Sequence, residues 1–142
     1  MPAAPADIVL IEDNPNDADL VKLSLERYRV TSSVHVIEDG QEALDYLFAA
    51  GGSGEMPKVI WLDVMLPTVD GFSVLDRIKS DTRTKDTPVV VITSSDRERD
   101  RQRSYDLGAN SYVIKPVEYL EFAATVRECG LYWLTMNRPP ND

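Results

Sequence analysis

The chain has 142 residues, of which 43% are hydrophobic, so it is long enough for one domain with a normal core. Its 24 acidic residues outnumber its 15 basic ones, and the net charge of −9 would repel nucleic acid on average. Apolar runs fall short of the roughly 18 residues that span a bilayer, no basic signal-peptide region opens the chain, and the single Cys129 has no partner for an internal disulfide. We therefore expect a soluble, cytoplasmic protein that binds neither nucleic acid nor membrane.

Short β-branched runs alternate with amphipathic stretches along the chain. The expected strands are residues 8–11, 34–37, 59–62, 89–92 and 112–114. The expected helices are residues 15–28, 40–50, 71–80, 97–109 and 117–130. Most of the strands are continuously apolar, as in a parallel sheet covered on both faces, whereas 34–37 alternates with polar residues and suits an edge strand. Five alternations of strand and helix indicate a doubly wound, five-stranded parallel α/β domain with helices on both faces.

The distribution of loop-forming segments along the sequence predicts one domain, residues 1–142. Its core covers about 7–130, and 131–142 is a C-terminal extension that ends in a frayed tail. The glycine-rich segment 51–57 is expected to be a flexible loop, because it lacks the lysine and spacing of a phosphate-cradling loop. No linker or second domain is apparent, so we expect no attached output domain.

Polar side chains follow the predicted strands at the point where each strand ends. Glu12 and Asp13 follow the first strand, Asp63 the third, Thr93 the fourth and Lys115 the fifth. In open α/β sheets this edge binds ligands, so these side chains should share one cleft. One lysine does not balance three acids, whereas a hard divalent ion such as Mg²⁺ would. Lysine and hydroxyl groups suit a phosphoryl group, which makes Asp63 a candidate nucleophile that carries phosphate.

Four motifs in register carry a resemblance to a known family. They are IEDN (11–14), LDVMLPTVDG (62–71), VITSS (91–95) and YVIKP (112–116). With these motifs the sequence resembles the response-regulator receiver domains of two-component signalling. The resemblance covers about residues 7–130 and implies a flavodoxin-like sheet of order 2-1-3-4-5. It also implies that a sensor histidine kinase phosphorylates Asp63 in a Mg²⁺-dependent reaction and that partner binding then switches.

The same resemblance implies roles for single residues. Lys115 matches the lysine that binds the phosphoryl group, and Thr93 and Tyr112 match the hydroxyl and aromatic switch positions. The Mg²⁺ ligands that it implies are Glu12, Asp13, Asp63 and the main-chain carbonyl of Met65. Met65 and Ser95 also occupy two variable positions that tune the lifetime of the phosphate in this family.

A narrower resemblance rests on three segments, AAGGSGEMPK (49–58), RSYDLGANSYVIKP (103–116) and GLYWLTMNRPP (130–140). They are similar to stand-alone receivers that serve phytochrome-type sensor kinases, which implies such a kinase as the partner. Receivers of that group often form dimers, so the resemblance also favours a homodimer.

The last predicted helix carries two apolar stripes at helical spacing. The expected inward stripe is Tyr119, Phe122, Ala123, Val126, Cys129 and Trp133. The second stripe is Leu120, Ala124, Leu131 and Leu134. We expect Leu120, Leu131 and Leu134 to form the homodimer contact, because a surface helix of a monomer should be charged there. The alternative is that the helix breaks at Gly130 and residues 131–136 fold back on their own domain.

Simpler interpretations exist for several of these residues. Asp63 could cap a helix, although Asp70, followed by Gly71, offers a better cap. Thr93 could be an ordinary strand residue, and Tyr112 could be plain core packing. Lys115 could be a solvated lysine, although its register with three acids argues against that interpretation.

Three other functions are alternatives to a signalling switch. An aspartate-nucleophile phosphatase resembling the haloacid dehalogenases needs a second Asp two residues after the nucleophile, where this chain has Met65. A flavin carrier needs a hydroxyl- and glycine-rich loop after the first strand, but residues 12–17 are acidic. A phosphorylation-independent scaffold would not need the complete set of acids. We therefore expect a phosphoacceptor switch and not an enzyme that turns over an external substrate.

Overall fold

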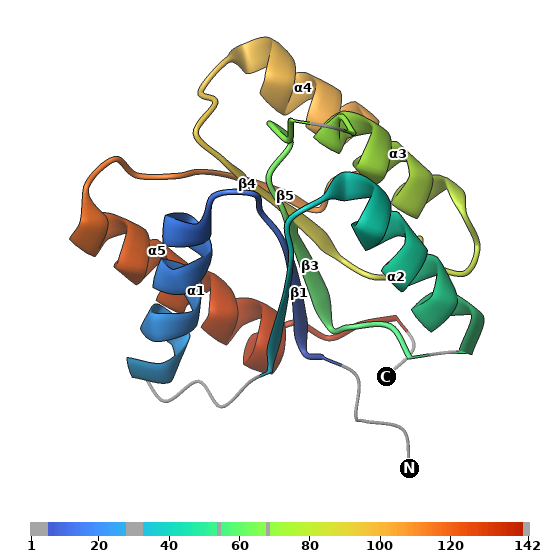
Figure 1. Ribbon diagram of the computed structural model, residues 1–142, viewed down its shortest axis with the longest axis horizontal. Coiled ribbons are helices and arrows are strands. Elements are labelled where there is room, and N and C mark those ends of the chain that lie inside the picture. The colour runs from blue at the N-terminus through green and yellow to red at the C-terminus, as the bar shows by residue number, and fades with distance from the viewer. Residues whose placement is uncertain (1–5, 28–32, 54, 68, 141–142) are drawn as a thin grey trace.

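The computed structural model describes residues 6–27, 33–53, 55–67 and 69–140. Within them, strands and α-helices alternate along the chain, and a π-helical segment follows the last α-helix (Figure 1). The strands are β1 (Ile8–Ile11), β2 (Val34–Ile37), β3 (Val59–Leu62), β4 (Val89–Thr93) and β5 (Ser111–Ile114). The helices are α1 (Pro15–Arg27), α2 (Gly40–Ser53), α3 (Gly71–Ser80), α4 (Glu98–Asp106), α5 (Tyr119–Leu131) and the π-helical η1 (Tyr132–Met136).

The five strands form one parallel sheet in the order β2-β1-β3-β4-β5. This confirms the predicted doubly wound architecture, its strand order and the edge position of β2. Ile11 at the end of β1 pairs with Leu62 at the end of β3, and Thr93 at the end of β4 pairs with Ile114 at the end of β5. The residues that follow these strands therefore emerge along one edge of the sheet.

Two hydrophobic clusters hold the sheet between its helices. Side chains of a strand point alternately to its two faces, so Ile60 and Leu62 join one cluster, and Val59 and Trp61 join the other. Helices α1 and α5 cover one face, and α2, α3 and α4 cover the other (Figure 1). Burial on both faces explains why these strands are continuous apolar runs, and it fixes the strand ends that carry the polar residues.

Several element ends differ from the prediction: α4 ends at Asp106 and not at residue 109, and α5 begins at Tyr119 and not at residue 117. Helix α2 continues through Ser53, so the expected loop at 51–57 begins later, and the packing of Gly51 against Arg83 outweighs the poor helix propensity of glycine. The alternative in which the last helix breaks at Gly130 is also wrong, because α5 runs to Leu131 and the lack of a side chain at Gly130 admits Leu25 from α1. The last residue of the predicted first helix, Tyr28, lies outside the described residues.

The C-terminal segment also departs from the predicted stripes. Tyr119 was expected to face inward, but it begins α5, lines the groove between α1 and α5, and is 57% exposed. Leu134 was expected on the outer stripe, but it is half-buried against the core cluster, as is Trp133. Leu134 turns inward because η1 makes wider turns than an α-helix, so the α-helical spacing of the stripe no longer holds there. The N–H of Asn137 bonds to the carbonyl of Tyr132, five residues earlier.

None of the helices in the described part of the chain is long and apolar enough to cross a membrane.

Candidate functional site

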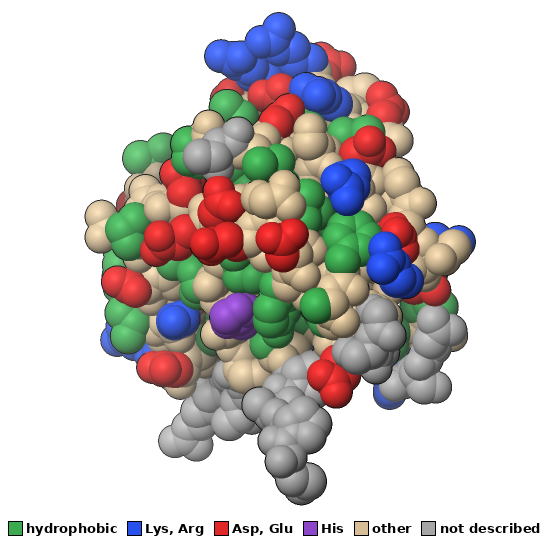
Figure 2. Space-filling view, turned by 45° about the vertical axis from the view of Figure 1, so that its right-hand side comes forward, with side chains coloured by type: hydrophobic (Ala, Val, Ile, Leu, Met, Phe, Trp, Pro, Cys, Tyr) green, Lys and Arg blue, Asp and Glu red, His purple; other side chains and the backbone are tan. Residues whose placement is uncertain are grey.

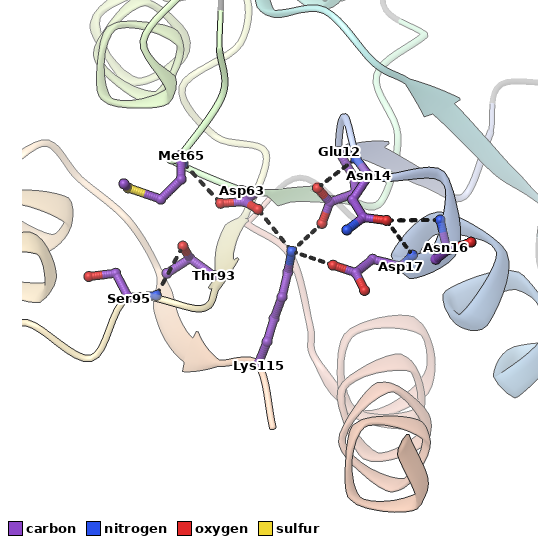
Figure 3. A network of polar contacts seen from close by, with 9 residues as sticks. All are labelled: Glu12, Asn14, Asn16, Asp17, Asp63, Met65, Thr93, Ser95 and Lys115. Carbon is purple, nitrogen blue, oxygen red and sulfur yellow. Dashed lines mark hydrogen bonds and ion pairs between the residues drawn. The ribbon is translucent and has the colours of Figure 1, made fainter. Parts of the chain in front are cut away.

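A single lysine joins the residues at the carboxyl edge of the sheet (Figure 3). Lys115 follows β5, and its main-chain N–H donates to the carbonyl of Thr93 at 2.7 Å. Its Nζ donates to Oδ2 of Asp63 at 2.8 Å, to the carboxylate of Glu12, and to Oδ2 of Asp17 at 2.9 Å. The prediction that Lys115 meets acids from the ends of β1 and β3 is therefore confirmed.

Asp63 directly follows β3 and is 7% exposed. Its Oδ2 accepts from Lys115, and its Oδ1 accepts from the main-chain N–H of Met65 at 2.9 Å. Its own main-chain N–H donates to the carbonyl of Ile11 at 3.0 Å, which ties it to β1. A buried carboxylate is costly unless it is paired, and here both oxygens have donors. The buried strand can therefore end in an acid.

Glu12 is more deeply buried still, at 3% exposure. Burial raises the pKa of its carboxyl group to about 7, although the hydrogen bond and charge of Lys115 act to lower this pKa. Burial alone would lower the pKa of Lys115, but its bonds to Asp63 and Glu12 outweigh burial and hold that pKa above its ordinary value. Lys115 is therefore a permanent cation at the base of the site, whereas Glu12 titrates near neutral pH.

Carboxylates gather beside this lysine in an arrangement that fits a divalent cation. Ligand oxygens of Glu12, Asp13 and Asp63 lie within 4.8 Å of one another. Carboxylate oxygens are the hard ligands that Mg²⁺ prefers, and the exposed Asp13 leaves the cluster open to solvent. These residues would hold the cation, which would offset the charge of the acids and of a phosphoryl group. Figure 2 shows a row of acidic side chains across one face of the molecule, in keeping with the net negative charge.

The two predicted switch residues meet at one loop residue. Thr93 is fully buried, and its hydroxyl oxygen accepts from the main-chain N–H of Ser95 at 3.5 Å. The hydroxyl of Tyr112 donates to the carbonyl of the same Ser95 at 2.8 Å. The Ser95 hydroxyl in turn donates to Asp100 in α4 at 2.6 Å. Ser95 therefore links the site, β5 and α4.

Two helices begin with an Asn or Asp residue in the capping position. Oδ1 of Asn14 accepts from the main-chain N–H of Asn16 at 2.9 Å at the start of α1. Oδ1 of Asp70 accepts from the N–H of Phe72 at 3.0 Å at the start of α3. The interpretation of Asp63 as a helix cap is therefore wrong, and its carboxylate belongs to the site.

Sequence reasoning missed one member of the site, Asp17. It lies in the first turn of α1, away from the strand ends at which polar residues were sought. The signal that could have found it is its place one helical turn beyond Asp13, since the start of α1 follows directly from the acidic loop. Among the described residues Lys115 thus pairs with the acids that follow β1 and β3, Glu12 and Asp63, and with Asp17 of α1 (Figure 3).

The raised pKa of Glu12 predicts how stability depends on pH in the metal-free protein. Its value of about 7 when folded exceeds the ordinary 4.5, so the protonated form favours the folded state. The stability that it contributes is complete below pH 4.5 and is lost as the pH rises through about 7. We expect wild type in a chelator to lose about 3 kcal/mol across this window relative to Glu12→Gln.

Urea unfolding of both proteins at several pH values measures this difference. Parallel pH profiles for wild type and Glu12→Gln would show that Glu12 does not titrate in this way.

Comparisons with known proteins agree with this geometry. Residues 8–127 match the response regulator receiver domain family. The probable methanogenesis regulatory protein FilR2 of Methanothrix harundinacea is 42% identical over 137 residues, which cover 96% of this chain and 88% of that protein. The crystal structure of the phosphorylated cyanobacterial phytochrome response regulator RcpA has a TM-score of 0.88 at 37% identity, covering 96% of this chain and 99% of that one. The Mn²⁺-bound form of response regulator Rcp1 has a TM-score of 0.84 at 33% identity with the same coverage. The chain therefore belongs to the response regulator receiver domain family, whose members act as signalling switches.

Proposed function

We propose that this receiver accepts a phosphoryl group on Asp63 from a sensor histidine kinase, in a reaction that requires Mg²⁺, and that the phosphorylated form binds its partners differently. The observation that carries the proposal is the setting of Asp63. It is a buried nucleophile held by Lys115 and Met65 beside an acidic cluster that fits a cation. The relatives named as a phosphorylated regulator and as a Mn²⁺-bound regulator support the same chemistry.

The chemical step follows from the charges of the site. A carboxylate oxygen of Asp63 attacks the phosphorus of the donor, a new O–P bond forms, and the P–N bond to the kinase histidine breaks. The electron pair of that bond stays on the imidazole nitrogen. Lys115 is held within hydrogen-bond reach of Asp63, so it can donate to a phosphoryl oxygen as negative charge accumulates. Glu12, Asp13, Asp63 and the main-chain carbonyl of Met65 would hold a divalent cation, which would supply the remaining positive charge.

The direct test is phosphorylation by a small phosphodonor. Wild-type protein mixed with acetyl phosphate and Mg²⁺ should gain the mass of one phosphoryl group, and the gain should disappear in a chelator. Peptide mapping after reductive trapping should place the group on Asp63. Intact-mass spectra that show no gain with Mg²⁺ present would contradict the proposal.

We propose that the switch runs through Ser95. Thr93 and Tyr112 both bond to the main chain of Ser95, so a shift of the Thr93 hydroxyl toward a phosphoryl group would release the loop and free Tyr112 to change rotamer. Thr93→Ala should still accept phosphate but should lose most of the phosphate-dependent change in partner affinity. Titration of the kinase with both forms of wild type and variant measures this change. Equal affinities of the phosphorylated and unphosphorylated wild type for the kinase would contradict the proposed switch.

The kinase is proposed to be of the phytochrome type, because RcpA is named as a phytochrome response regulator. FilR2, at higher identity, is named for a different process, so the kinase type rests on the structural neighbours. A cytoplasmic location stays a prediction.

We also propose that the protein forms a homodimer through α5 and the C-terminal segment. Leu120 is 67% exposed and Leu131 is 39% exposed, and they lie about three helical turns apart on one face of α5. Tyr132 and Met136, at 48% and 66% exposure, extend the apolar surface into η1. Leu134 packs on the core and contributes less than the sequence predicted. A two-fold contact on this surface would be self-complementary and would cover these side chains.

A charge on this surface should separate the two copies. A two-fold contact presents each substituted residue twice, so Leu131→Asp is expected to give a monomer that still accepts phosphate. Ile114→Asp is the matched control, because Ile114 is similarly exposed, at 42%, but lies on β5. Light scattering of concentrated protein measures the mass. A monomer mass for wild type, with or without phosphate, would defeat the proposal, and loss of the dimer in Ile114→Asp alone would move the contact to β5.

A further inference from the structure

Asp17 holds Lys115 from a different direction than the other two acids. It projects from the first turn of α1, and its Oδ2 accepts from Nζ of Lys115 at 2.9 Å (Figure 3). Its side chain is 27% exposed, whereas that of Lys115 is 9% exposed. The partly buried pair therefore retains more of its electrostatic attraction than a pair on the open surface would.

Asp17 also differs from the other two partners of Lys115 in its relation to the cation site. Glu12 and Asp63 belong to the cluster whose oxygens lie within 4.8 Å of one another, and Asp17 does not. A cation held by that cluster draws the oxygens of Glu12 and Asp63 and repels the ammonium group of Lys115. Of the three bonds that fix Nζ in this structure, only the bond to Asp17 comes from outside the cluster.

We propose that Asp17 is a positioning residue, which keeps the Lys115 ammonium group beside Asp63 while the cation and the phosphoryl group occupy the site. This inference rests on the proposed phosphorylation of Asp63. An ammonium group has three N–H donors, and the bond to Asp17 uses the one that points toward α1. The other two donate to Asp63 and Glu12 in this structure, and the donor on Glu12 would turn to an oxygen of the incoming phosphoryl group once the cation draws Glu12 away. Through this bond α1 becomes part of the phosphoryl-binding apparatus.

The opposite role for Asp17 is competition, in which its carboxylate draws Lys115 away from the phosphoryl group. The geometry favours positioning, because Lys115 reaches Asp17 and Asp63 at the same time, at 2.9 and 2.8 Å. Lys115 therefore need not leave one acid to bind the other. Removing the charge of Asp17 should slow phosphorylation if Asp17 positions Lys115 and should speed it if Asp17 competes for Lys115, so a variant separates the two roles.

The test compares Asp17→Asn with Asp19→Asn. Asp19 is an exposed acid of the same helix and lines the same groove as Asp17 and Lys115, so both changes remove one negative charge near the site. The rate of labelling by acetyl phosphate with Mg²⁺ should fall roughly tenfold in Asp17→Asn, the change that accompanies loss of one charge-assisted bond. Asp19→Asn should label at the wild-type rate or slightly faster, because an anionic donor meets less repulsion. Asp17→Glu, which restores the charge, should recover most of the rate.

A second measurement reports on Lys115 directly. The ¹⁵N–¹H signal of a lysine ammonium group is seen when hydrogen bonds slow its exchange with water. The Lys115 signal should persist in Mg²⁺ for wild type and Asp19→Asn, and it should broaden or vanish for Asp17→Asn. Both variants should unfold cooperatively and should respond to Mg²⁺ alike, which excludes a general loss of structure.

The outcomes are distinct. An Asp17→Asn variant that labels as fast as Asp19→Asn, or faster, and keeps the Lys115 signal in Mg²⁺ overturns the positioning role. If wild type itself is not labelled, the proposed function fails, and the Lys115 signal alone then decides whether Asp17 holds the lysine. If Asp17→Asn does not fold, Asp17→Ala, which also removes the charge and favours the helix, takes its place in both measurements.

Discussion

Asp63→Asn is expected to abolish the Mg²⁺-dependent gain of one phosphoryl group. An amide oxygen is a poor nucleophile and cannot form the acyl phosphate, so labelling should fall to background. Among the described residues, Asp63 is the acid that combines burial at a strand end with bonds from both Lys115 and the main chain of Met65. Intact-mass spectrometry after incubation with acetyl phosphate measures the effect.

The variant should stay folded, which makes the loss of labelling interpretable. The amide oxygen of Asn at this position can still accept from the N–H of Met65, and Lys115 keeps Glu12 and Asp17 as partners. Asp70→Asn is the control, because it removes a carboxylate nearby but retains a side-chain oxygen to cap α3. Full labelling of Asp63→Asn would mean that another residue carries the phosphate.

Gly71→Ala is expected to lower the free energy of unfolding by about 3 kcal/mol or more. A β-carbon on Gly71 would lie 2.3 Å from the α-carbon of Val64 and 2.7 Å from its carbonyl carbon and oxygen. These are main-chain atoms directly after Asp63, so relief requires α3 or the loop that follows Asp63 to move. We therefore expect slower phosphorylation together with the loss of stability.

Gly130→Ala is the matched control for this substitution. Its β-carbon would meet Cδ2 of Leu25 at 2.6 Å, which is the end of a side chain and not main chain, although Leu25 is itself buried. Alanine also favours the helix by about 1 kcal/mol, so the loss of stability should be clearly smaller than for Gly71→Ala. Urea unfolding of the two variants and wild type measures the contrast. Similar stabilities for Gly71→Ala and wild type would show that the contact with Val64 relaxes without cost.

The sequence by itself determined the architecture and most of the site. Continuous apolar runs such as 59–62 require cover on both faces, which in a chain of alternating strands and helices means a parallel sheet. The position of Asp63 directly after such a run, with Glu12 and Lys115 after two others, then followed from the rule that parallel strands end along one edge. The caps at Asn14 and Asp70 were predictable as well, because a cap bonds to residues two or three positions away.

Only the tertiary structure decided the features that depend on residues far apart in the chain. Asp17 is a member of the site because α1 begins beside Lys115, almost a hundred positions later, and no local pattern encodes that approach. A break at Gly130 was the alternative that the sequence left open, yet Gly130 lies inside α5, where the lack of a side chain leaves room for Leu25 of α1. Leu134 turned inward because η1 changes the spacing of the last turn. Local propensity and periodicity describe one element at a time, whereas contacts between elements arise from the way that their side chains fill the space between them.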